Sequence, residues 1–293
     1  MTSDDTTGSS TIEPGTTGEA SRATNEPPIP EPESVRVTGA DERPVIEVTV
    51  AAPVATVWAH LRDPELIRRW HGWEDPGLDA EIQFIYVEHS EADDERHVIR
   101  GRGGPPPGSY ELGDRFDVEE SGPGTTIVRI TRGPRGTDPD WDAMYDDVTQ
   151  GWTSFLAQLK FAVERHPGVT RRTVFRGRFG EPGPRALNLL DAGALPMVAG
   201  SPYRLEVPGL LSIAGSLWFR TDDQIGLLVD GYGPGLVIIA DKPGEDSQTT
   251  VVSMIIVSTF GLAEDEHARV EAEWAAWWSV HHPEPESSAT PNA

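Results

Sequence analysis

Histidine side chains are the first groups in this sequence that could transfer protons or bind a metal ion. The eight histidines are scattered along the chain. His281 and His282 are adjacent in a predicted helix, where successive side chains point about 100° apart, which is unfavourable for holding one metal ion. His89 and His97 could face each other across a hairpin, but a solvated pair is the better interpretation. We therefore predict no metal site.

Carboxylates are the second source of acid–base chemistry. Glu81, Glu88 and Glu111 lie near the ends of predicted strands, and Asp146 and Asp147 lie at the start of a long predicted helix, where the helix dipole alone favours acids. Glu81 could reach the mouth of a pocket, although a solvated strand end is favoured. The sequence has no cysteine, no nucleophile elbow, no zinc-protease motif and no Walker loop. We predict no catalytic residue and no cofactor.

The elements that would position these groups begin with a strand at residues 45–50, where polar and apolar residues alternate. Pro53 starts a helix, and Asp63-Pro64 interrupts it and starts a second short helix that ends in Trp70. The stretch TQGWTSFLAQLKFAVERHPG, residues 149–168, is an amphipathic helix, because its apolar residues recur at helical spacing. Further strands are predicted between these helices, at residues 80–89, 96–102, 115–121 and 125–133.

The same order of elements follows a second time after Gly168. A strand at 171–179 and a helix at 183–195 precede a series of strands, and a long helix at 263–282 ends the series. The strands are predicted at 203–207, 210–219, 224–232, 235–241 and 249–262. We interpret this pattern as a diverged internal repeat that lies in element order, not in residue identity. The predicted domains are therefore 43–168 and 169–282.

The composition limits the classes of partner. There are 24 Lys and Arg against 48 Asp and Glu, a net charge of −24, which argues against binding to nucleic acid or to an anionic membrane surface. The N-terminus lacks the basic and apolar regions of a signal peptide, and no apolar run is long enough to span a membrane. We therefore predict a cytoplasmic protein. Residues 1–42 and 283–293 are poor in large apolar residues, and we predict that these acidic tails are disordered.

The first half of the chain resembles the helix-grip fold of the START/Bet v 1-like (SRPBCC) superfamily. Within it, residues 44–166 look most like the branch related to the activator of Hsp90 ATPase. The stretches that carry the resemblance are VIEVTVAAPVATVWAHLRDPELIRRWHGW and QGWTSFLAQLKFAVE. The residues at the positions of the family pattern are Pro53, Trp58, Pro64, Trp70, Gly151 and Trp152. The second half matches only in outline. The predicted fold class is α+β, with two tandem helix-grip copies.

The resemblance implies a curved antiparallel sheet wrapped around the long helix, with an apolar cavity between them. Aromatic residues from elements that such a fold turns inward are the pocket candidates: Trp58, Trp70, Trp73, Phe84, Tyr86, Phe116, Trp152 and Phe155. For any one of them core filling is favoured over ligand contact, and Trp73 is expected at the edge of the pocket. Members of the superfamily bind hydrophobic small molecules, and some are polyketide cyclases or bind chaperones.

Three functions remain open at this point. The first is a protein that binds a hydrophobic small molecule. The second is an activator-like adaptor with a protein partner. The third is an enzyme of the polyketide cyclase or dehydratase kind, which would need at least one buried ionisable group in its cavity. Binding is favoured over catalysis.

Overall fold

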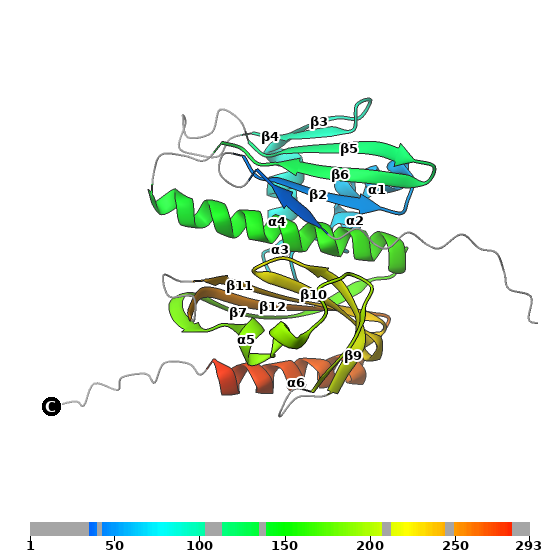
Figure 1. Ribbon diagram of the computed structural model, residues 1–293. Coiled ribbons are helices and arrows are strands. Elements are labelled where there is room, and N and C mark those ends of the chain that lie inside the picture. Colours follow the sequence, from blue (N-terminus) through cyan, green and yellow to red (C-terminus); the bar gives the residue numbers. More distant parts are fainter. Residues whose placement is uncertain are drawn as a thin grey trace, which may run out of the picture. The chain divides into compact units, whose positions relative to one another are not determined.

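A computed structural model describes residues 35–39, 43–102, 113–134, 139–206, 212–243 and 249–282. They form two antiparallel sheets of six strands each, together with helices, which confirms the α+β class (Figure 1). The predicted tails lie largely outside the described residues. An exception is the short strand β1 (Arg36–Thr38), which pairs with β2 although residues 1–42 are predicted to be disordered. Among the described residues, no helix is long and apolar enough to cross a membrane.

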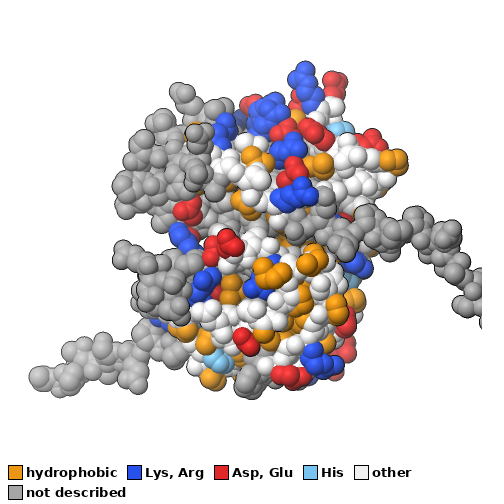
Figure 2. All heavy atoms as spheres, in the orientation of Figure 1, with side chains coloured by type: hydrophobic (Ala, Val, Ile, Leu, Met, Phe, Trp, Pro, Cys, Tyr) orange, Lys and Arg blue, Asp and Glu red, His pale blue; other side chains and the backbone are white. Residues whose placement is uncertain are grey.

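The first sheet has the strand order β1-β2-β6-β5-β4-β3. Its remaining strands are β2 (Val45–Val50), β3 (Ser90–Asp93), β4 (Val98–Gly101), β5 (Arg115–Gly122) and β6 (Thr125–Thr131). The alternation predicted for β2 is observed, with Ile46, Val48 and Val50 buried on one face. Cross-strand pairs such as Ile46 with Ile130 continue that apolar face into β6. The opposite face is polar, and Figure 2 shows basic and acidic side chains interspersed there, in line with ion pairs such as Arg129 with Glu47.

Short helices cover part of this sheet. Helices α1 (Val54–Arg62) and α2 (Pro64–Ile67) follow β2, and the Asp63 side chain accepts a hydrogen bond from the Glu65 amide at the start of α2. Both helices are in the predicted places. Trp70, just after α2, is fully buried.

The strand predicted at 80–89 is wrong, because this segment is helical. Helix α3 (Leu78–Gln83) continues directly into the π-helix η1 (Phe84–Glu88). Its buried residues are Leu78, Ile82 and Tyr86, each four residues from the next, which places them on one helical face. The apparent alternation through Ile82, Phe84 and Tyr86 is misleading, since Phe84 is exposed.

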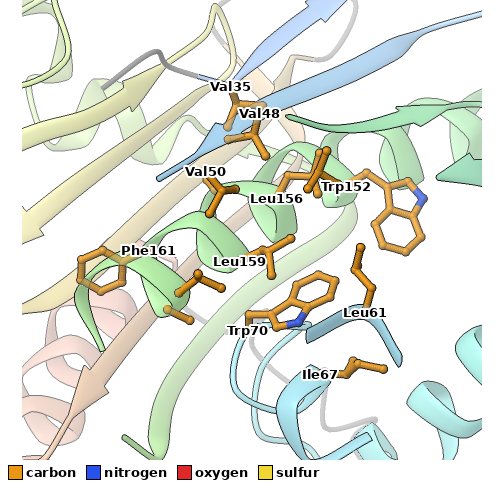
Figure 3. Close-up of a cluster of buried hydrophobic side chains, with 14 of the residues drawn as sticks. Val35, Val48, Val50, Leu61, Ile67, Trp70, Trp152, Leu156, Leu159 and Phe161 are labelled. Carbon is orange, nitrogen blue, oxygen red and sulfur yellow. The ribbon is translucent and has the colours of Figure 1, made fainter. Parts of the chain in front are cut away.

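Helix α4 (Pro139–Arg165) lies between the two sheets (Figure 1). It starts earlier than the predicted helix and contacts β2 of the first sheet and β11 of the second. Figure 3 shows its side chains Trp152, Leu156 and Leu159 near Val48, Val50 and Trp70 in the core of the first half. Its polar face is also buried: the Ser154 hydroxyl donates to the Gln224 side chain at 2.8 Å, and the Trp218 indole donates to the Ala157 carbonyl at 3.1 Å.

The second sheet has the order β7-β12-β11-β10-β9-β8. Its strands are β7 (Arg171–Pro184), β8 (Pro202–Glu206), β9 (Ser212–Arg220), β10 (Gln224–Val229), β11 (Gly235–Pro243) and β12 (Thr249–Phe260). The helix predicted at 183–195 is shorter than expected, because only α5 (Ala186–Leu189) and the 3₁₀ turn η2 (Ala192–Ala194) form there. A second 3₁₀ turn, η3 (Asp230–Tyr232), precedes β11. Helix α6 (Glu264–His281) buries Val270, Trp274 and Trp277. Each sheet is thus followed in the chain by a long helix.

Candidate functional site

A cavity of about 320 Å³ lies where α4 faces the second sheet. Its walls come from the segment after α2, from α3 and η1, from the first half of α4, and from strands β7, β11 and β12. Its lining includes His71, Trp73, Glu81, Ile85, Val148, Gly151, Trp152, Phe155, Phe179, Ala240, Val252 and Met254. Both halves of the chain are therefore needed to enclose it.

This location differs from the predicted one, between the long helix and the sheet of the first half. The reason is that aromatic rings fill much of that space. The rings of Phe116 and Trp152 meet edge to face with centroids 5.1 Å apart, and those of Tyr86 and Trp152 do so at 6.5 Å. A smaller cavity of about 220 Å³ remains beside them and shares Ile85, Val148 and Trp152 with the larger one.

The eight aromatic candidates divide into three groups. Trp73, Trp152 and Phe155 line the larger cavity, with Trp73 half-buried and stacked on Phe175 at 3.8 Å between centroids. Phe84, Tyr86 and Phe116 line the smaller cavity, together with Trp152.

Trp58 and Trp70 line neither of these cavities. The Trp58 indole donates to Asp94 at 3.1 Å, and the Trp70 indole donates to the His60 carbonyl at 2.8 Å. Both side chains are buried, so core filling describes them.

His71 and Asp241 are the buried ionisable residues among those that line the larger cavity. The His71 side chain is fully buried, and its Nδ1 atom lies 3.0 Å from the Tyr86 hydroxyl. Its Nε2 atom lies 3.4 Å from Glu81 Oε1 and makes no hydrogen bond to any residue that the structure describes. Burial lowers the pKa of His71, and this outweighs the opposite effect of Glu81. The imidazole is therefore neutral near pH 7.

The charge of Glu81 decides which nitrogen of His71 carries the proton. The interaction with His71 lowers the pKa of the Glu81 carboxyl, so the group is ionised near pH 7. A carboxylate next to Nε2 favours a proton on that atom, which leaves Nδ1 as the acceptor for the Tyr86 hydroxyl. Burial raises the pKa of Tyr86, so its hydroxyl keeps the proton that it donates. The Nε2–H group is thus buried beside the Glu81 carboxylate.

Arg171, at the start of β7, holds the backbone on which His71 lies. Its guanidinium donates to the Trp70 carbonyl at 3.0 Å, to the His71 carbonyl at 2.6 Å and to the Gln158 side chain at 3.1 Å. Burial lowers its pKa to about 9, which still leaves it charged near pH 7. The Arg171 guanidinium, which belongs to the second half of the chain, therefore holds the loop after α2 that carries His71.

Other polar residues at the cavity have partners. The Lys242 ammonium lies 3.0 Å from the Asp147 carboxylate, so a strand of the second sheet and α4 are joined by an ion pair. Asp241 accepts hydrogen bonds from the amides of Ala186 and Leu187 and from the Ser253 hydroxyl. Among the described residues, no three His, Asp or Glu side chains lie together as a metal site would require.

Sequence reasoning found Glu81 as a residue that could reach a pocket, but it missed His71 and Arg171. Nothing in the local pattern distinguishes His71, because its partners Tyr86 and Arg171 are 15 and 100 residues away. His89, paired with His97 in the prediction, instead lies against Phe84, with centroids 3.9 Å apart. Glu111 lies outside the described residues.

We expect the titration midpoint of the His71 ring to lie below the ordinary histidine pKa of about 6.5, because burial lowers its pKa. Because the pKa in the folded state is below that of the unfolded chain, His71 lowers stability only as the pH falls below about 6.5. Ring ¹H–¹³C NMR signals of the histidine-labelled chain would measure this, with His71→Gln used for assignment. A His71 signal with a midpoint at pH 6.5 or above would contradict the assignment.

Comparisons with known proteins gave structural likenesses only. No protein-family model and no curated protein matches the chain. The chain is similar to the di-domain ARO/CYC BexL from the BE-7585A biosynthetic pathway, with a TM-score of 0.34 and 17% identity over 83% of this chain and 99% of that chain. For the di-domain ARO/CYC StfQ from the steffimycin biosynthetic pathway, the TM-score is 0.32 and the identity 11%, over 81% of this chain and 96% of that chain.

A third similar structure is CalU16 from Micromonospora echinospora. Its TM-score is 0.27 and its identity 19%, over 44% of this chain and 70% of that chain.

Proposed function

We propose that this protein binds a hydrophobic small molecule in the cavity between α4 and the second sheet. The observation that carries the proposal is the cavity itself, whose walls are mainly aromatic and aliphatic and whose polar lining residues include the buried His71 and Asp241. Its volume of about 320 Å³ falls at the lower end of the range of small-molecule sites, which is about 300–1,000 Å³. A compact, ring-shaped ligand fits this size better than a long chain.

We further propose that residues 43–168 and 169–282 are two helix-grip units of the SRPBCC superfamily. The support is the repeated order of a strand, short helices, antiparallel strands and a long helix. The branch related to the activator of Hsp90 ATPase, with its adaptor function and protein partner, stays a prediction from the sequence, since none of the contacts described above bears on a chaperone.

Binding can be tested with the full chain and naphthalene as the probe. Native mass spectrometry after gentle purification would detect a ligand that copurifies, and isothermal titration calorimetry would measure naphthalene binding. We expect saturable binding with one site, because the cavity walls exclude water from one apolar ligand of this size. A chain that neither carries a copurified ligand nor binds naphthalene would contradict the proposal.

An enzyme of the cyclase or dehydratase kind is the second candidate, because the cavity contains the buried ionisable group that such an enzyme needs. His71 and Glu81 offer a proton donor and a proton acceptor side by side. The test is to incubate a copurified ligand with the wild type and with Glu81→Gln and to follow its mass. Loss of turnover with retained binding in the variant would favour the enzyme, and an unchanged ligand in both would count against it.

A further inference from the structure

A groove of about 750 Å³ lies on the outer, polar face of the first sheet. Its charged lining residues are the five arginines Arg43, Arg100, Arg102, Arg115 and Arg129 and the two acids Glu91 and Asp117. Figure 2 shows basic side chains gathered over this sheet, with acidic ones between them. The whole chain has 48 Asp and Glu against 24 Lys and Arg, so this excess of positive charge is local and makes the groove a candidate for binding an anion.

The strand register places two of these arginines directly opposite each other. Arg100 of β4 pairs with Arg115 of β5. Their neighbours Ile99 and Phe116 are buried on the inner face, so both arginine side chains lie on the outer face. Like charges directly opposite each other on an antiparallel pair are destabilising. Because neighbouring strands are about 4.8 Å apart, one anion can contact both guanidinium groups and offset their repulsion.

The carboxylates at the groove leave part of its positive charge without a partner. Three arginines are paired, as Arg115–Asp117, Arg102–Glu91 and Arg129–Glu47, with N···O distances of 2.9, 2.9 and 2.7 Å. Glu91 lies opposite Arg100 in register, but its carboxylate is bound to Arg102. The Arg43 Nε atom donates to the Arg132 carbonyl. Among the residues that the structure describes, no carboxylate therefore forms an ion pair with Arg43 or Arg100.

We propose that this groove binds a soluble phosphate monoester, whose phosphate oxygens accept hydrogen bonds from Arg100 and Arg115. A phosphate monoester carries a charge of about −1.5 to −2 near pH 7, which matches the two unpaired arginines better than the single charge of a carboxylate does. The fork of N–H donors on a guanidinium suits phosphate oxygens, and Asp117 uses only part of the donors of Arg115.

The same net charge restricts the source of the phosphate group. A chain with a net charge of −24 is repelled by an anionic membrane surface, so the ligand is a soluble molecule and not a lipid headgroup. The groove shares no lining residue with the apolar cavity at α4, and the proposal does not depend on what that cavity binds.

Calorimetry on the full chain with glucose 6-phosphate as the probe tests the proposal, since this compound is too polar for the apolar cavity. At pH 7.5 and an ionic strength of about 20 mM, where screening is weak, we expect one saturable site whose affinity falls as salt is added. Gluconate, with its single carboxylate, should bind at least about tenfold more weakly, and glucose should not bind.

Two arginine variants locate the site. Arg100→Gln should weaken the binding of glucose 6-phosphate at least about tenfold, because it removes hydrogen bonds to a charged group. Arg96→Gln is the matched control: it removes the same charge from a side chain that is 78% exposed between β3 and β4 and does not line the groove, and it should bind like the wild type. Without ligand, Arg100→Gln should not lower the melting temperature, since it also removes the repulsion from Arg115.

Several outcomes would overturn the proposal. A wild type that does not bind glucose 6-phosphate, or that binds gluconate equally well, contradicts the ligand class. Equal weakening in Arg96→Gln and Arg100→Gln would show that only net charge matters and that the groove is not the site. Sedimentation of the chain with phosphatidylcholine vesicles that contain phosphatidic acid would identify a lipid headgroup and contradict a soluble ligand.

Discussion

Replacing Arg171 with methionine should lower the free energy of unfolding by about 3 kcal/mol or more. The guanidinium donates to the carbonyls of Trp70 and His71 and to the Gln158 side chain, and all of these groups are buried. Methionine keeps much of the length and apolar volume but donates no hydrogen bond, so several buried acceptors would lose their partner at once. Urea unfolding followed by tryptophan fluorescence would measure the change.

The neighbouring residue provides a matched control. Arg172 lies next to Arg171 on β7, is 39% exposed in its side chain and pairs with Glu264 at the surface. Arg172→Met should cost less than about 1 kcal/mol, because exposed ion pairs contribute little. Equal losses in the two variants would show that the buried contacts of Arg171 do not stabilise the fold.

Local patterns were sufficient for much of the fold. Strand β2 alternates in sequence and in burial, and Pro53 and Asp63-Pro64 mark the helix boundaries that the structure shows. The apolar spacing of 149–168 predicts the C-terminal part of α4, which ends at Arg165. These features depend on residues that are close in the chain, and so the sequence alone indicates them.

The strand predicted at 80–89 failed because two periods fit the same short segment. Ile82, Phe84 and Tyr86 suggest a two-residue period, whereas Leu78, Ile82 and Tyr86 suggest a helical one. The neighbouring packing decides between them. Tyr86 reaches His71 with its hydroxyl, and Phe84 is left exposed.

The site was only partly predictable because its parts come from distant segments. Helix α4 has one apolar stripe in sequence, and the prediction placed a single sheet against it. Its opposite face carries the polar residues Ser154 and Gln158, and polar residues on a helix usually face solvent. In the structure both are buried: Ser154 donates to Gln224 of the second half, and Gln158 donates to the Trp70 carbonyl in the loop after α2. Without that second contact, neither the position of the cavity nor the role of Arg171 follows from the sequence.

Filling the cavity from within should weaken ligand binding while the fold is preserved. Gly151 lines the cavity on α4, and a Cβ atom added there would contact only the Phe155 ring, at 3.8 Å. A leucine at this position would extend into the space that we assign to the ligand. We expect Gly151→Leu to weaken naphthalene binding at least about tenfold, because accommodating both groups would overpack the site by about 1.4 kcal/mol or more.

Gly151→Ala separates this effect from a general change in the helix. Alanine adds only the Cβ atom, which the structure accommodates, and it should raise stability by up to about 1 kcal/mol because glycine is unfavourable inside a helix. We expect this variant to bind naphthalene like the wild type, measured by the same calorimetry. If Gly151→Leu folds as stably as Gly151→Ala and still binds naphthalene unchanged, the ligand does not occupy the cavity beside α4, and the aromatic wall of Trp73, Trp152 and Phe155 is core alone.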